Sequence, residues 1–141
     1  MVNLEAEEVM RLQVTLGQVK VVGDTGPGRL VVIPITGGTI HGKKITGKVV
    51  PGGADWNMTL PDGTAHVFAR YMLETGDGEF IAIENEGWIA PGSRAVIKTV
   101  PRFMANTEGK YAFLNHGVYA GELSATPGVQ DSVDIVIYRL R

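Results

Sequence analysis

The segment from Thr64 to Thr75 alternates between two kinds of side chain, and this alternation limits the possible folds more than any other feature of the sequence. Ala65, Val67, Ala69, Tyr71 and Leu73 share one face, while His66, Phe68, Arg70, Met72 and Glu74 share the other. A period of two residues is typical of a β-strand that lies on a core. Since Gly76-Asp77-Gly78 and then Glu79–Asn85 follow, the sequence predicts an antiparallel hairpin.

Similar short segments recur along the chain, and the turns between them account for many of its 19 glycines and 7 prolines. The further predicted strands are Met10–Leu16, Arg29–Thr36, Ile40–Val50, Ala54–Leu60, Arg94–Phe103, Lys110–Gly121 and Ser132–Leu140. Pro34 cannot donate a ladder hydrogen bond, so it indicates an edge, an end or a bulge. We predict a single all-β domain over residues 1–141, an antiparallel β-barrel of about eight to nine strands or a barrel-like sandwich.

The composition argues against several classes of partner. The net charge is −2 with no basic block, which does not favour a nucleic acid or an anionic membrane. The longest apolar stretch, Leu30–Ile35, is far shorter than the ~20 residues of a membrane-spanning helix. The chain has no cysteine and its first residues are acidic, so we expect a cytoplasmic protein. The three histidines lie far apart, and we expect neither a metal nor a cofactor.

Several local motifs resemble the uncharacterised bacterial family DUF3237, also called UPF0311. These motifs are Pro51-Gly52-Gly53-Ala54-Asp55-Trp56, Ala69-Arg70-Tyr71, Thr75-Gly76-Asp77-Gly78, Ile81–Gly87, Pro101-Arg102-Phe103, and Tyr111 through Leu114-Asn115. The resemblance covers roughly Leu12 to Leu140, and it departs from the family at Ala112-Phe113 and near Trp88–Pro91. It implies an antiparallel β-barrel, in a family whose activity is generally not assigned.

The polar face of the predicted strand Thr64–Thr75 supplies one group of candidate site residues. If His66, Arg70 and Glu74 point into the barrel, a ligand or a charged partner must compensate for their burial. If they point outward, they are ordinary surface residues, and alternation alone favours this second interpretation. The resemblance raises the case for Arg70, because it lies within the matching Ala-Arg-Tyr motif.

Two further groups carry suitable chemistry. Asp55 and Trp56 follow a double glycine that can present them at a barrel mouth, although Asp55 capping a turn and Trp56 packing in the core are equally compatible. Tyr111, Phe113 and Asn115 fall on one face of the predicted strand Lys110–Gly121, together with Tyr119. They could form a pocket wall or an interface patch.

These residues support two hypotheses of function. The first is a binding protein whose pocket inside the barrel takes a small anionic or hydroxylated organic ligand, with Arg70 clamping it and Trp56, His66, Tyr111, Phe113 and Asn115 lining the pocket. The second is a cofactor-independent isomerase, cyclase or lyase, in which Asp55 or Glu74 removes a proton and Arg70 stabilises the resulting anion. Either function is compatible with a homo-oligomer that pairs edge strands, through the Pro34 strand or Val133–Leu140.

Overall fold

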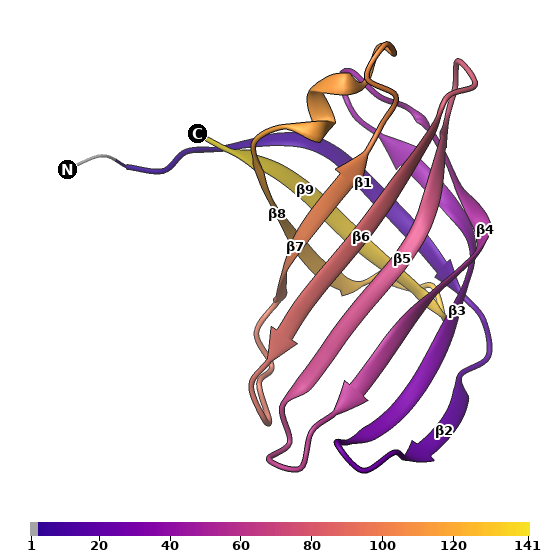
Figure 1. The fold of residues 1–141 in the computed structure, drawn as a ribbon, viewed down its shortest axis with the longest axis vertical. Helices are drawn as coiled ribbons and strands as arrows, with labels where there is room; N and C mark the ends of the chain where they lie inside the picture. The colour runs from indigo at the N-terminus through magenta and orange to yellow at the C-terminus, as the bar shows by residue number, and fades with distance from the viewer. Residues whose placement is uncertain (1–2) are drawn as a thin grey trace.

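Nine antiparallel strands form one sheet in the computed structural model, which describes residues 3–141. They are β1 (Ala6–Leu16), β2 (Lys20–Asp24), β3 (Arg29–His41), β4 (Gly47–Thr59), β5 (Ala65–Thr75), β6 (Phe80–Ile89), β7 (Ile97–Met104), β8 (Val118–Ala125) and β9 (Ser132–Leu140). Their order is β1-β9-β8-β7-β6-β5-β4-β3-β2, and β1 also pairs with β3. This pairing closes eight strands into a barrel and leaves β2 as an extra strand on β3 (Figure 1). The predicted all-β barrel is confirmed.

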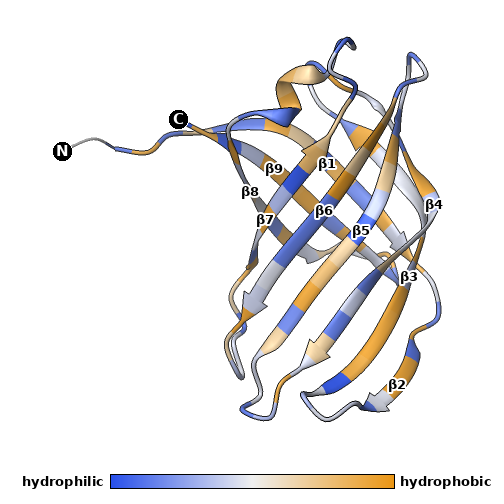
Figure 2. Cartoon of the chain, viewed as in Figure 1, coloured by the Kyte–Doolittle hydropathy of each residue, from blue (hydrophilic) through white to orange (hydrophobic). Residues whose placement is uncertain are grey.

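The β5–β6 hairpin shows how alternation places side chains in this barrel. The two strands pair as the predicted antiparallel hairpin, and the register runs from Ala65 opposite Ile89 to Glu74 opposite Phe80. On β5, Tyr71 and Leu73 are buried, whereas Met72 between them is 46% exposed. Figure 2 shows that hydrophobic and hydrophilic residues both occur along β5. The apolar face of β5 therefore points into the barrel.

Two glycine-containing segments that the sequence assigns to turns lie inside strands instead. Gly37-Gly38 belongs to β3 and Pro51-Gly52-Gly53 to β4, and the β3–β4 and β4–β5 registers shift at these points. Gly38 has a φ of 143°, and a Cβ there would overlap the carbonyl oxygen of Gln13 on β1. The glycines thus permit bulges and close strand contacts. The predicted strand Ile40–Val50 is wrong, since the chain turns between β3 and β4.

The predicted strand Lys110–Gly121 is also wrong in its first half. A short 3₁₀ helix, η1 (Ala112–Asn115), lies there, and β8 begins only at Val118. The Asn115 side chain accepts a hydrogen bond from the backbone N–H of Ala105 at 2.8 Å and donates one to the Ala105 carbonyl at 2.9 Å. These contacts hold η1 beside the end of β7, so Tyr111, Phe113 and Asn115 do not form a strand face.

The strands proposed for edge pairing are not edges in the described part of the chain. Pro34 lies in β3, which pairs with β4 on one side and with β1 and β2 on the other. The C-terminal strand β9 lies between β1 and β8. Closure of the barrel removes both edges. Within residues 3–141, no helix is long and apolar enough to span a bilayer.

The interior is packed differently in its two halves. Near η1 the barrel is filled by large side chains from several strands, including Met10, Leu73, Ile81 and Phe103, and by Leu114 of η1 itself. The other half lies toward the β4–β5 and β6–β7 connections, at the lower end of Figure 1. There the side chains do not meet in the middle, and a cavity remains.

Candidate functional site

A cavity of about 200 Å³ lies inside the barrel, in the half away from η1. Most of its wall is aliphatic: Val14, Leu16, Ile33, Ile35, Val67, Ala69, Ile89, Ile97, Leu123, Val133 and Ile135 line it. An apolar protein cavity of about 150 Å³ is sufficient for benzene. The cavity therefore has room for about one six-membered ring with a small substituent.

Small residues occupy several inward positions in this half of the barrel. Ala69 faces the cavity from β5, and Gly87 on β6 and Gly121 on β8 are both buried. A Cβ at Gly87 would lie 2.8 Å from the Lys98 carbonyl oxygen and 3.1 Å from Cγ2 of Thr99. A Cβ at Gly121 would collide with the Thr99 hydroxyl. The two glycines therefore make room for Thr99, while Ala69 leaves open space above its methyl group.

Three buried polar atoms in the cavity wall make no hydrogen bond within residues 3–141. They are the hydroxyl of Tyr71, Oδ1 of Asn85 and the hydroxyl of Thr99. Each of these residues is at most 4% exposed. An unsatisfied buried polar group costs about 1–3 kcal/mol, and native interiors contain few of them. All three residues line the cavity, so its wall contains polar groups that the protein itself leaves unpaired within residues 3–141.

Asp55 adds an ionisable group to the same wall. Its Oδ1 accepts a hydrogen bond from the backbone N–H of Phe68 at 3.0 Å. Burial raises the pKa of the Asp55 carboxyl, although the bond from Phe68 and one from the Asn57 side chain act in the opposite direction. The registers place Asp55 opposite Ala69 and Ala69 opposite Asn85. Asp55, Ala69 and Asn85 therefore form a row across β4, β5 and β6, with the small side chain of Ala69 in the middle.

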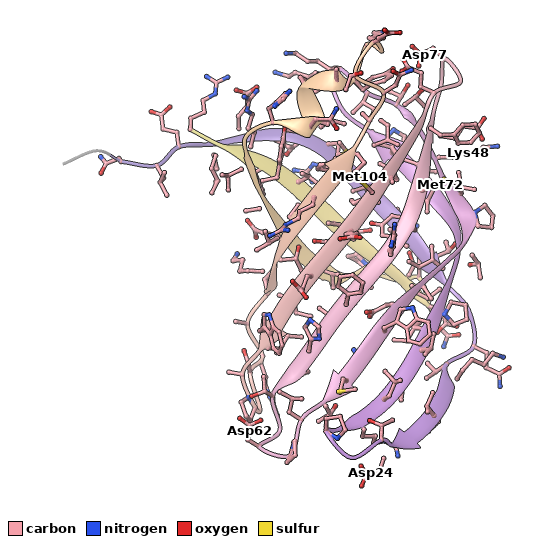
Figure 3. The ribbon with its side chains drawn as sticks, in the orientation of Figure 1. Asp24, Lys48, Asp62, Met72, Asp77 and Met104 are labelled. Carbon is pink, nitrogen blue, oxygen red and sulfur yellow. The ribbon has the colours of Figure 1, made fainter. Side chains whose placement is uncertain are left out.

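The structure places Arg70 and Glu74 on the outside of the barrel. Arg70 is on the same face of β5 as Met72, whose side chain is labelled on the outer surface in Figure 3. Its Nε lies 3.6 Å from Oε1 of Glu84, and its side chain is 63% exposed. Glu74 faces Lys48 at 3.6 Å, also on the outer surface. Because side chains alternate along a strand, both residues lie on the face of β5 that is opposite to the face of Tyr71. Neither can therefore contact a ligand in the cavity.

His66 and Trp56 also lie on the outer face. The His66 ring stacks on Trp88 with 3.9 Å between ring centroids, and its Nε2 lies 2.7 Å from Oε2 of Glu86. Trp56 is 51% exposed. Because Trp56 neighbours the inward-facing Asp55 in the extended strand β4, its side chain must leave the sheet on the opposite side.

The predicted aromatic wall closes the far end of the barrel instead of lining the cavity. The hydroxyl of Tyr111 donates a 2.7 Å hydrogen bond to Asp77, which also accepts one from Thr75 at 2.6 Å. Phe113 packs against the core. Asn115 is occupied by its two bonds to Ala105. Asp77 is structural here, as the turn motif predicts. Of the candidate residues, the structure brings only Asp55 to the cavity.

Sequence reasoning missed Asn85 and Thr99 as site residues, and a usable signal existed. In the predicted hairpin, Asn85 continues the inward face of β6 after two buried isoleucines, Ile81 and Ile83. A polar residue in such a series requires a partner or a ligand. Thr99 likewise lies on the buried face of β7, two residues before the buried Pro101. Among residues 3–141, no cluster of three or more potential metal ligands was found.

The amino-acid sequence is similar to that of a known protein family. Residues 4–140 match the family model described as a protein of unknown function, DUF3237. The chain belongs to this family. A UPF0311 protein of Rhodopseudomonas palustris is 38% identical to it over 85 residues, which is 60% of this chain and 56% of that protein. The chain thus spans just over half the length of the curated relatives that it matches.

Solved structures of other proteins share the barrel. The R. palustris protein of unknown function RPA1785 superposes with a TM-score of 0.88 at 27% identity, covering 100% of both chains. An enzyme from Penicillium herquei superposes with a TM-score of 0.79 over 100% of this chain and 97% of its own. At 20% identity, the second likeness shows the fold alone.

Proposed function

We propose that this DUF3237 protein binds a small organic molecule inside the hollow half of its barrel. The observation that carries the proposal is the set of three buried, unpaired polar atoms on Tyr71, Asn85 and Thr99 in an otherwise aliphatic wall. Ligand sites are typically apolar cavities with a few fixed polar groups. Arg70, which the sequence suggested as a clamp, has no part in this proposal because it lies outside the barrel.

The test is ligand binding in a variant whose cavity is filled. Ala69→Leu adds three carbon atoms inside the cavity, whereas Ala82→Leu makes the same change on β6 at a position opposite the outward-facing Met72. Small ring compounds should raise the melting temperature of the parent protein and of Ala82→Leu but not of Ala69→Leu. At 100 times its dissociation constant, a ligand stabilises the fold by about 2.7 kcal/mol. Equal shifts in all three proteins would place binding elsewhere and contradict the proposal.

A second candidate is proton transfer without a cofactor, and the environment of Asp55 favours it. Burial raises the pKa of this carboxyl above its usual value, and a raised carboxyl pKa is a common feature of residues that transfer protons in catalysis. The Tyr71 hydroxyl and the Asn85 amide lie in the same wall, as polar groups for a reacting oxygen. Isomerisation, cyclisation and elimination are reactions that one such carboxyl can promote.

Asp55→Asn separates the two candidates once a ligand is known. The amide keeps the shape of the side chain and an acceptor for the Phe68 N–H, but it cannot exchange a proton at neutral pH. Turnover that disappears in Asp55→Asn while binding persists supports catalysis. If product forms as fast in Asp55→Asn as in the parent, the carboxyl has no catalytic role.

Two further expectations concern the protein in the cell. We propose that it acts in the cytoplasm, because a chain without cysteine suits a reducing compartment, and fractionation checks this. We also propose that it associates with itself, and light scattering at micromolar concentration gives the mass directly. A mass equal to the 15.1 kDa chain would contradict self-association.

A further inference from the structure

We infer that the ligand is a neutral molecule of one small ring that carries a hydroxyl group. This inference rests on the proposed binding function and narrows the class of ligand. It departs from one part of the sequence-based expectation, which allowed an anion. The argument uses three properties of the cavity: its charge, its hydrogen-bonding groups and its volume.

The charge of the cavity opposes an anionic ligand. Within the described chain, no lysine, arginine or histidine is among the residues that line the cavity. Its one acidic residue is Asp55. The arginine closest in sequence to the wall residues of β5 is Arg70, whose side chain is outside and beside Glu84. A carboxylate in this cavity would lack a cation and would face a second carboxylate, which is unfavourable in a low-dielectric site.

The hydrogen-bonding groups match a hydroxyl. Asn85 offers the unpaired acceptor Oδ1, and Asp55 offers carboxylate oxygens. Tyr71 offers a donor, because burial raises the pKa of its phenol and keeps the proton in place. The Thr99 hydroxyl can act in either role. A ligand hydroxyl is both donor and acceptor, so it can pair with groups of both kinds.

The row of residues across β4, β5 and β6 gives this hydroxyl a position. Asp55, Ala69 and Asn85 are consecutive partners in register. With neighbouring strands about 4.8 Å apart, the Cα atoms of Asp55 and Asn85 are about 10 Å apart. Only the methyl group of Ala69 lies between them, so a hydroxyl above it has polar groups on both sides. The aliphatic side chains that line the cavity, among them Ile33 and Ile97, then surround the ring of the ligand.

Three probes with the same ring test the inference: benzene, phenol and benzoate. Isothermal titration calorimetry at pH 7.5, where phenol is neutral and benzoate is ionised, measures each dissociation constant. We expect phenol to bind roughly 3–10 times more tightly than benzene, as one added hydrogen bond allows. We expect benzoate to bind more weakly than phenol by about tenfold or more, since the two carboxylates repel.

Variants connect these affinities to Asp55. In Asp55→Asn the repulsion is removed, so benzoate should bind more tightly than it does to the parent, while benzene is unaffected. Glu84→Gln removes a carboxylate from the outer face beside Arg70 and is the matched control. It should leave all three dissociation constants unchanged.

The outcomes separate this inference from the proposed function. Benzoate binding as tightly as phenol would overturn the inference but leave a small-molecule site in the barrel. Benzene binding as tightly as phenol would overturn the role of the hydroxyl in the same way. If none of the three probes binds up to millimolar concentration, the proposed function fails and the inference fails with it.

Discussion

The hydroxyl of Thr99 gives the sharpest test of whether the cavity is prepared for a ligand. Thr99 is 4% exposed, and its hydroxyl makes no hydrogen bond within residues 3–141. Thr99→Val replaces this hydroxyl by a methyl group of similar shape. The change should therefore remove the cost of an unsatisfied buried polar group, about 1–3 kcal/mol. The free energy of unfolding should rise by that amount.

Thr75→Val is the matched control, because Thr75 is equally buried at 3% exposure and has its hydroxyl fully used. Its Oγ1 donates to Asp77 at 2.6 Å and accepts the backbone N–H of Glu79 at 2.9 Å. Valine would leave the Glu79 N–H without this acceptor, so we expect a loss of about 1–3 kcal/mol. Identical chemistry should thus change the stability in opposite directions at the two positions.

Urea unfolding of the ligand-free protein at pH 7 measures both changes directly. In thermal unfolding, about 3 °C per kcal/mol for a domain of this size corresponds to a rise of about 3–9 °C for Thr99→Val. If Thr99→Val instead loses stability, as Thr75→Val should, the Thr99 hydroxyl is satisfied in solution. That result would refute the proposal that the Thr99 hydroxyl is left unpaired for a ligand.

Three further predictions follow from the same contacts. Burial raises the pKa of Asp55 in the folded protein, so its ionisation costs stability as the pH rises through the folded pKa, and no cost exists below the unfolded pKa. Asp55→Asn should therefore stabilise the protein more at pH 7 than at pH 3; an equal gain at both pH values in urea unfolding argues against this cause. Hydrogen bonds from Thr75 and Tyr111 lower the pKa of Asp77, so its contribution is present above the unfolded pKa and is lost as the pH falls through the folded pKa. Asp77→Asn should lower the melting temperature at pH 7 more than at pH 3, and a pH-independent effect would contradict the linkage. Asn115→Ala removes both bonds to Ala105 and should cost about 1–3 kcal/mol, seen as faster hydrogen exchange at Ala105, and unchanged exchange there would show that η1 does not depend on Asn115.

The sequence predicts the fold class well because β-strand periodicity is a local property. The alternation from Thr64 to Thr75 corresponds to β5, and its hairpin with β6 forms in the expected place. Glycine and proline were less informative. Gly37-Gly38 and Pro51-Gly52-Gly53 lie between predicted strands, where the sequence indicates turns, but they permit bulges inside β3 and β4, since a bulge and a turn both need unusual backbone angles.

The predicted site followed charged and aromatic side chains, and the structure shows why that was misleading. Arg70, Glu74, His66 and Trp56 carry recognisable chemistry but lie on the outer face, where water solvates them at little cost. Asn85 and Thr99 attract little attention in a sequence. Their importance comes from being polar at inward positions, which is visible only once the strand registers are known.

The sequence alone determined that this chain forms antiparallel strands and that β5 has two faces of different kind, and it suggested Asp55 as a candidate site residue. These are consequences of a two-residue period and of side-chain type, and they need no distant contacts. Closure of the barrel through β1 and β3, the hollow left by Ala69, and the row that joins Asp55 to Asn85 were decided by the tertiary structure. They depend on register between strands distant in sequence, and a shift of one residue would turn every side chain of a strand to the other face.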